Sequence, residues 1–256
     1  MTIKLKLMAV LAIIMLCACK ATPPYNPYKV EKNEITQVKR IALMPVGIFI
    51  EVDDETKQEA FFHDELVTRF TDKGFTVIPA QEWRNIYEPL KKSSGELYDP
   101  TTGKPNKEKL KAVREQARAV YIEKFTPDAF LYSGVMPVKA EWHHNNATWD
   151  GHQAPTTGVS GFWADFTSPQ AYGTVGALSF FINIEDRNQR DLFVEFGGLQ
   201  LLQHVGHGGF TPRPKTERLV NEQENSNSVN LASCRFFELW QPPVKNKKGK
   251  VKSCRK

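Results

Sequence analysis

The stretch KRIALMPVGIFIEV, residues 39–52, decides the fold class of this chain. It is a run of β-branched and other apolar side chains, which is typical of a strand buried within a sheet. Pro45 stands near the middle or the end of that strand. Asp53 and Asp54 follow directly and are candidate caps for a helix that starts at residue 55.

The residues after this strand predict a helix over 55–73 and a short second strand over 75–79. Gly74 suits the end of the helix, because glycine adopts the backbone conformation that commonly terminates helices. A strand, a helix and a strand in this order favour parallel pairing with a right-handed crossover. The apolar face of the helix consists of Phe62, Leu66, Val67 and Phe70.

The remaining elements extend this unit into a mixed sheet. We expect a second helix and a third strand, then an antiparallel hairpin whose two strands alternate apolar and polar residues, then a final helix. The sequence therefore predicts an α/β (α+β) fold, a single domain with parallel strand-helix-strand units followed by the hairpin and a C-terminal helix. These elements are expected at residues 107–124, 128–141, 178–185, 191–203 and 216–240.

The N-terminus has the pattern of a secretion signal. Lys4 and Lys6 precede an uninterrupted apolar run over residues 7–19. As a helix this run spans roughly 20 Å, which is shorter than the roughly 30 Å hydrocarbon core of a bilayer. The run therefore favours a cleaved signal over a membrane span.

The run ends in Leu16-Cys17-Ala18-Cys19, which resembles the lipobox of bacterial lipoproteins. The resemblance implies cleavage after Ala18 and acylation of Cys19, with diacylglycerol on the thiol and a further chain such as palmitate on the new amine. Two or more chains anchor a protein stably where one does not. Lys20 resembles the outer-membrane sorting signal of enteric bacteria, which implies a site facing the periplasm. The alternatives are an ordinary signal peptide with incidental cysteines and an uncleaved short anchor.

These features divide the chain into four parts. We expect a signal peptide over 1–18, a lipidated cysteine with a proline-rich tether over 19–38, an α/β domain over 39–241 and a basic tail over 242–256. An extended tether of that composition reaches roughly 50 Å. We interpret the tail as a solvated extension, or alternatively as a segment that binds anionic lipid head groups.

The net charge of +5 does not indicate nucleic-acid binding. Without the nine basic residues of the signal and the tail, 25 basic residues face 29 acidic ones, a net charge of −4. A domain of that charge binds a phosphate backbone poorly. Nucleic acid is therefore not an expected partner.

Four motifs carry a family resemblance. The chain is similar to a broad group of bacterial envelope lipoproteins that includes the curli-secretion pore subunit, the outer-membrane activators of penicillin-binding proteins and the amino-terminal domain of the Tol-system propeller protein. The resemblance implies the same fold rather than an activity, because the shared motifs are structural. The motifs are IALMPVG at 41–47, DELVTRF at 64–70, KGFTVIPAQEW at 73–83 and DAFLYSGV at 128–135.

An aromatic insert over residues 143–177 departs from that group. Loops of this length are uncommon unless they have a function, and rigid aromatic side chains make good anchors in protein interfaces. We expect the insert to bind a partner protein of the envelope. Alternatively, its aromatic residues fold back and extend the core. The candidate residues are Trp142, Trp149, Phe162, Trp163, Phe166 and Tyr172.

Cys234 and Cys254 are the cysteines that remain after Cys19 in the mature chain. An extracytoplasmic location permits a disulfide between them, which would close a loop of about 20 residues and contribute about 3 kcal/mol in the chain-entropy description. It would also attach the basic tail to the last helix. The alternative is a buried Cys234 and a free Cys254.

The histidines predict no metal site. His204 and His207 have a spacing that could serve one metal in a helix, but the glycines around them favour a loop. His143, His144 and His152, close to Asp150 in the sequence, are interpreted as surface residues.

Neither a nucleophile elbow nor a phosphate-binding loop is present in the sequence. We therefore expect no catalytic residues, metal or cofactor, and a membrane-anchored binding or assembly module. The alternatives are a self-assembling subunit of an outer-membrane secretion complex and a metal-dependent enzyme. The sequence leaves the oligomeric state open.

Overall fold

The computed structural model describes residues 25–143, 146–155, 172–206 and 209–240. The predicted strand over 39–52 is divided into β1 (Arg40–Leu43) and β2 (Gly47–Ile48). Both pair in parallel with the same long strand, β4 (Ala129–His143). Pro45 lies between β1 and β2, where its missing N–H leaves a gap in the ladder.

The predicted strand-helix-strand unit is confirmed. Helix α3 (Glu55–Asp72) begins at Asp54, whose carboxylate accepts a hydrogen bond of 2.9 Å from the Lys57 N–H. The apolar face predicted for this helix is directed into the core, with Phe62, Leu66 and Phe70 buried. Strand β3 (Thr76–Ile78) follows, and β1 lies between β3 and β4, parallel to both.

The predicted hairpin is also confirmed. Its first strand is longer than the expected 178–185, and its second strand is two residues shorter than the expected 191–203. Strand β7 (Tyr172–Asp186) pairs antiparallel with β4 over the whole length of both strands. Strand β8 (Asp191–Leu201) returns antiparallel to β7. The small hairpin of β5 (Asn146–Trp149) and β6 (His152–Pro155) extends the sheet. A second small hairpin, of β9 (Gln203–Gly206) and β10 (Gly209–Pro212), stands beside it.

The C-terminal helix is shorter than the predicted 216–240. A 3-10 turn, η1 (Lys215–Glu217), precedes α7 (Glu222–Phe237). Leu219 lies between them with a φ of 59°, in the left-handed region that interrupts a helix. The carboxamide of Asn221 then caps α7 by accepting from the N–H groups of Gln223 and Glu224.

The sequence patterns missed two helices, and α2 (Lys32–Ile35) is the shorter of them. Helix α4 (Ala80–Ser93) starts directly after Pro79 and contains Pro89. Because proline usually breaks a helix, the sequence pattern did not indicate one here. Helix α5 (Lys107–Phe125) agrees with its prediction. The two helices pack together with the buried side chains of Ala42, Met44, Ile78, Trp83, Ala117, Tyr121 and Phe130.

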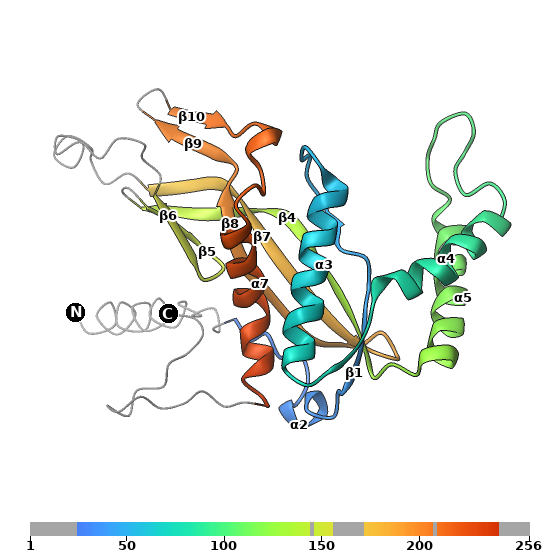
Figure 1. Cartoon of the computed structure of the whole chain (residues 1–256). Coiled ribbons are helices and arrows are strands. Elements are labelled where there is room, and N and C mark those ends of the chain that lie inside the picture. Colours follow the sequence, from blue (N-terminus) through green and yellow to red (C-terminus); the bar gives the residue numbers. More distant parts are fainter. Residues whose placement is uncertain (1–24, 144–145, 156–171, 207–208, 241–256) are drawn as a thin grey trace, which may run out of the picture.

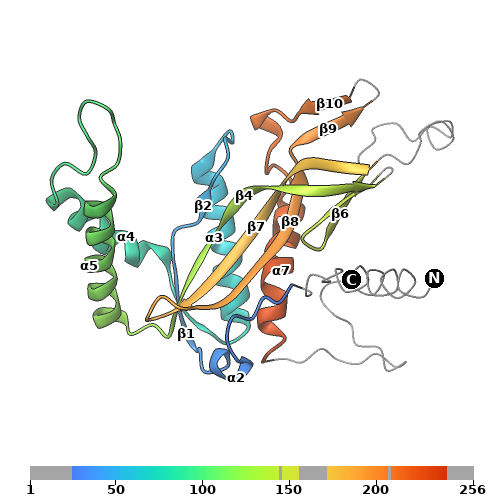
Figure 2. The ribbon, with the colours of Figure 1, turned by 180° about the vertical axis from the view of Figure 1, so that it is seen from behind.

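The helices form layers on both faces of the sheet (Figure 1). Helices α3 and α7 lie side by side on one face, over the main core that contains Phe62, Phe180 and Phe236. Helices α4 and α5 cover only the end of the opposite face near β1. Seen from behind, β4, β7 and β8 therefore lie in front of α3 and α7 (Figure 2).

The tether is shorter than predicted, because the chain is packed against the domain from Tyr25 onward. Tyr28 forms an isolated antiparallel bridge with Phe193 of β8. A short helix, α2 (Lys32–Ile35), follows, and Ile35 and Val38 are buried in the main core. Apolar contacts with β8 and α7 hold this segment against the domain. The sequence did not predict this packing, because the prolines and tyrosines of the segment show no helical or strand periodicity.

Candidate functional site

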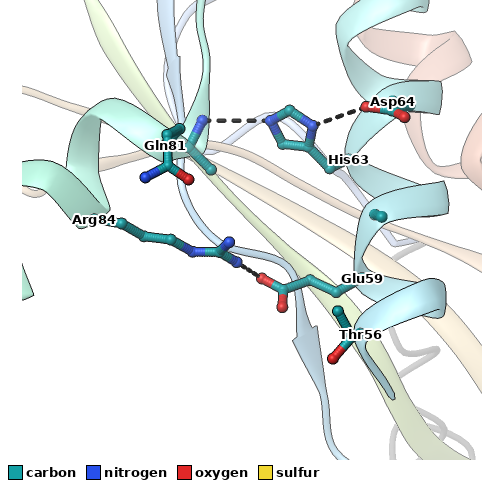
Figure 3. Close-up of a pocket in the computed structure, with 8 residues that line it drawn as sticks. Thr56, Glu59, His63, Asp64, Gln81 and Arg84 are labelled. Carbon is teal, nitrogen blue, oxygen red and sulfur yellow. Dashed lines mark hydrogen bonds and ion pairs between the residues drawn. The ribbon is translucent and has the colours of Figure 1, made fainter. Parts of the chain in front are cut away.

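A small polar pocket lies between α3 and α4 (Figure 3). Its cavity volume is about 220 Å³, below the range of roughly 300–1,000 Å³ that is usual for ligand sites. An ion pair between Glu59 of α3 and Arg84 of α4 crosses it. These two charges neutralise each other within the pocket. The lining residues are Thr56, Glu59, Ala60, His63, Asp64, Ala80, Gln81 and Arg84.

His63 has a structural role in this pocket. Its Nε2 atom accepts a hydrogen bond of 3.3 Å from the Ala80 N–H, and its Nδ1 atom lies 3.2 Å from Oδ1 of Asp64. Pro79, at the N-cap of α4, provides no side-chain cap. His63 therefore satisfies one of the free N–H groups at the start of α4, and both ring nitrogens are engaged. The pocket is better described as a polar packing contact between α3 and α4 than as a reaction centre.

A row of three phenylalanine side chains lies on the sheet face that α3 and α7 do not cover. Phe49 follows β2, Phe181 belongs to β7 and Phe196 to β8. The ring centroids of Phe49 and Phe181 are 6.2 Å apart, and those of Phe181 and Phe196 are 6.3 Å apart. Phe181 and Phe196 are half-buried, whereas Phe49 is 63% exposed. We call these three residues the aromatic row.

The backbone beneath the aromatic row is held by close packing. A Cβ atom added at Gly134 would lie 2.4 Å from the Gly47 carbonyl oxygen and 3.1 Å from the Phe181 ring. Only glycine permits β2 and β4 to approach this closely. The Phe49 N–H donates to the Val135 carbonyl at 2.9 Å. Phe49 is thus presented from a fixed backbone, and not from a freely moving loop.

An open groove adjoins Phe49. It has a cavity volume of about 480 Å³ and runs along the segment that connects β2 to α3. The residues that line it are Ile48, Phe49, Ile50, Glu51, Val52, Glu55 and Lys215. Sequence reasoning missed this surface, because residues 47–52 read as part of a buried strand. Pro45 and Gly47 were the signals that the strand stops early.

The predicted partner-binding residues are separated by the fold. Trp149 is buried, and its indole N–H donates to the Leu178 carbonyl at 2.9 Å. Trp142 is half-buried and packs with Trp149 in a small core of its own. For these two residues the structure agrees with the alternative, in which the aromatics extend the core. Tyr172 starts β7, opposite His143. Phe162, Trp163 and Phe166 lie outside the described residues.

Much of the predicted loop over 143–177 is regular structure. Strands β5 and β6 and the start of β7 occupy its two ends. The turn between β5 and β6 contacts β8, since the Gly198 N–H donates to the Asp150 carbonyl at 3.0 Å. The expectation of a loop was wrong for these strands. Short strands that are rich in polar residues show only weak alternation of apolar and polar side chains, so the sequence pattern did not indicate them.

The cysteine predictions remain open. Cys234 lies in α7 and is 7% exposed, whereas Cys19 and Cys254 lie outside the described residues. The disulfide stays a prediction. Within the described parts of the chain, no three His, Cys, Asp or Glu side chains are grouped as metal ligands. No described helix combines the length and the apolar character needed to cross a membrane.

Comparisons with known proteins add little to this geometry. No protein family matches the sequence. No curated protein matches it. Among solved structures, one similar chain is that of the lipoprotein GNA1162 from Neisseria meningitidis, with a TM-score of 0.31, 15% identity, and coverage of 63% of this chain and 81% of that one. A similarity at this level carries no inference, and the resemblance to the three envelope groups stays an expectation from sequence.

We expect the stability of the domain to depend on pH through His152, the first residue of β6. Burial lowers the pKa of His152 below its ordinary value, and the Glu224 carboxylate opposes that shift. The ring packs against Trp149 with centroids 4.7 Å apart. The unfolded chain therefore takes up this proton more readily than the folded chain, so stability is present above about pH 6.5 and is lost as the pH falls below it.

We predict that His152→Gln removes this loss. Thermal unfolding, followed by circular dichroism from neutral to mildly acidic pH, should show a shallower decline of Tm than in the parent protein. His143→Gln is the matched control, because His143 is exposed at the end of β4. If the Tm of the His152→Gln variant falls as steeply with pH as that of the parent protein, the pH dependence does not come from His152.

Proposed function

We propose that this chain is a lipid-anchored, non-enzymatic module of the bacterial envelope that binds another envelope protein. The observation that carries the proposal is the sequence Leu16-Cys17-Ala18-Cys19 at the end of a short apolar run. An acylated Cys19 holds the domain at a membrane, and Lys20 favours the outer membrane with the domain facing the periplasm. The fold supports this role, because the described residues between 25 and 240 form a folded domain that starts shortly after such an anchor.

The anchor is tested by Cys19→Ala. We expect the parent protein to fractionate with membranes and to carry fatty acid on Cys19, found by mass spectrometry of the N-terminal peptide. The variant should lose the fatty acid and accumulate as an unprocessed precursor. Cys17→Ala is the matched control and should leave both properties unchanged. A mature, membrane-bound Cys19→Ala product would contradict the proposal.

The aromatic row supports the binding part of the proposal. Phe49, the exposed member of the row, lies on a rigid backbone and provides contact area at low entropic cost, and a few such residues commonly dominate the energy of an interface. The groove beside Phe49 gives a partner side chain a place to insert. Phe49 is preferred to the predicted Trp149 as the anchor, since Trp149 is buried.

We predict that Phe49→Ser weakens partner capture at least tenfold, which corresponds to about 1.4 kcal/mol or more. A photo-crosslinking residue at position 49 in intact cells should give a discrete adduct, and Phe49→Ser should reduce co-purification of the captured protein. Val220→Ser is the control, because Val220 is equally exposed, at 63%, and lies outside the row. Equal capture by both variants would remove the aromatic row as the interface.

A further inference from the structure

The groove beside Phe49 adjoins an acidic segment of the chain. Residues 51–55 connect β2 to α3 and read Glu-Val-Asp-Asp-Glu. Glu51 and Glu55 line the groove itself, and Asp53 lies between them in the sequence. All three side chains are exposed. Negative charge and apolar surface therefore meet at this place.

The charge of this segment is not neutralised within the domain. In the part of the chain that the structure describes, the carboxylates of Glu51, Asp53 and Glu55 form no ion pair. Asp54 differs from them, because its carboxylate caps α3. A binding partner can therefore reach three carboxylates without first breaking an ion pair.

Two basic residues lie close to the segment. Lys215 lines the groove, and Nη1 of Arg218 donates to the Glu51 carbonyl at 2.7 Å. The Arg218 guanidinium also donates twice to the Arg213 carbonyl, at 3.2 and 3.0 Å. Backbone oxygens thus hold this guanidinium in place. The four acidic residues of the segment outnumber these two bases, so the groove has a negative local charge.

The apolar side of the groove is held by the core. Ile48, Ile50 and Val52 are half-buried and pack against the main hydrophobic core. Phe49 points the other way and is 63% exposed, although its N–H is bonded to the Val135 carbonyl. A segment that binds here gains apolar contact without having to order the groove. Rigidity of this kind lowers the entropic cost of association.

We propose that the groove takes a cationic, apolar segment of the partner protein. A leucine-like or aromatic side chain packs on Phe49, and neighbouring Lys or Arg side chains pair with the exposed carboxylates. This inference rests on the proposed function and adds the chemistry of the partner. Complementary charge selects the partner, because an acidic segment is repelled at this contact. The three carboxylates are those of Glu51, Asp53 and Glu55.

Two short synthetic peptides test the proposal. Both contain a run of leucines with one photo-reactive leucine, flanked by lysines in the first peptide and by serines in the second. Binding to the full, lipidated protein in a neutral detergent is measured by fluorescence anisotropy. We expect the lysine peptide to bind about tenfold more tightly and to crosslink to residues 48–55. High salt should remove most of this difference, because it screens exposed charges.

A variant of the acidic segment identifies the charges responsible. It combines Glu51→Gln, Asp53→Asn and Glu55→Gln, and it retains Asp54 as the helix cap. We expect its affinity for the lysine peptide to fall about fivefold, the sum of small gains from three exposed ion pairs. Its affinity for the serine peptide should not change. The matched control removes three exposed charges from α5, by Glu108→Gln, Glu115→Gln and Glu123→Gln.

Three results would overturn the inference: equal affinity for the lysine and serine peptides, equal affinity of the groove variant and the α5 control, or a crosslink outside residues 48–55. Failure of the proposed interface is scored separately, by partner capture in cells. If Phe49→Ser reduces capture but the peptides show no charge dependence, the aromatic row remains the interface and only this inference is wrong. If Phe49→Ser leaves capture unchanged, both are wrong.

Discussion

Gly197→Ala is expected to lower the free energy of unfolding by about 3 kcal/mol, the upper part of the range for overpacked cores. A Cβ atom at this position in β8 would lie 2.0 Å from the Ser228 carbonyl oxygen and 3.0 Å from the Ala232 backbone nitrogen. These are backbone atoms of α7, which cannot rotate away as a side chain can. The hydrogen bond of 2.6 Å from the Ser228 hydroxyl to the Gly197 carbonyl would be strained as well.

Chemical denaturation of the parent protein and the variant measures this effect. Gly176→Ala in β7 is the matched control, because the nearest atom to its added Cβ is Leu202 Cβ at 3.6 Å, an ordinary contact. That variant should stay within about 1 kcal/mol of the parent, since alanine also reduces the freedom of the unfolded chain. If the two substitutions cost the same, α7 is not seated on β8 as the structure shows.

Arg235→Ala is expected to cost about 3 kcal/mol, the lower end of the range for breaking a buried ion pair. The Glu195 carboxylate in β8 is 1% exposed and lies 3.2 Å from Nη1 of Arg235. Removal of the guanidinium breaks this ion pair at a carboxylate that is buried in β8. The lower end of the range applies because the Arg235 side chain is itself 30% exposed, so water partly replaces it.

The comparison with a surface ion pair separates burial from charge. Arg84→Ala removes the pair with Glu59, whose side chains are 42% and 26% exposed, and should cost less than about 1 kcal/mol. Adding Glu195→Gln to Arg235→Ala should recover part of the lost stability, because the buried charge is then gone. If Arg84→Ala and Arg235→Ala lower the free energy of unfolding by the same amount, the Glu195 carboxylate is accessible to solvent.

Local patterns predicted the elements that bury one regular face. Helix α3 has a clear apolar stripe and an aspartate cap, and β7 carries buried apolar residues at every second position, including Phe180 and Ile182. Both kinds of pattern depend on a few neighbouring residues, so one sequence is enough to detect them. Helix α4 was not detected, because Pro79 and Pro89 resemble loop signals although Trp83, Ile86, Tyr87 and Leu90 lie on its packed face.

The candidate site was harder to predict than the fold. Trp149 and Phe49 are both large aromatics within two residues of a glycine, and nothing in their local sequence says which is buried. The position of Trp149 depends on the Leu178 carbonyl, and that of Phe49 on Phe181 and Gly134. Those partners are distant in sequence. Exposure at such positions is therefore a property of the assembled sheet.

By itself the sequence determined the order of the main strands and helices and the mixed sheet, since each depends on short-range patterns, and it predicts the signal that ends at Cys19. Only the tertiary structure decided that residues 25–38 belong to the domain, that Trp149 is core and Phe49 is surface, and that both ends of the described chain leave from one side. The physical reason is that burial and pairing along β8 depend on contacts between segments far apart in the chain, such as Tyr28 with Phe193 and Arg235.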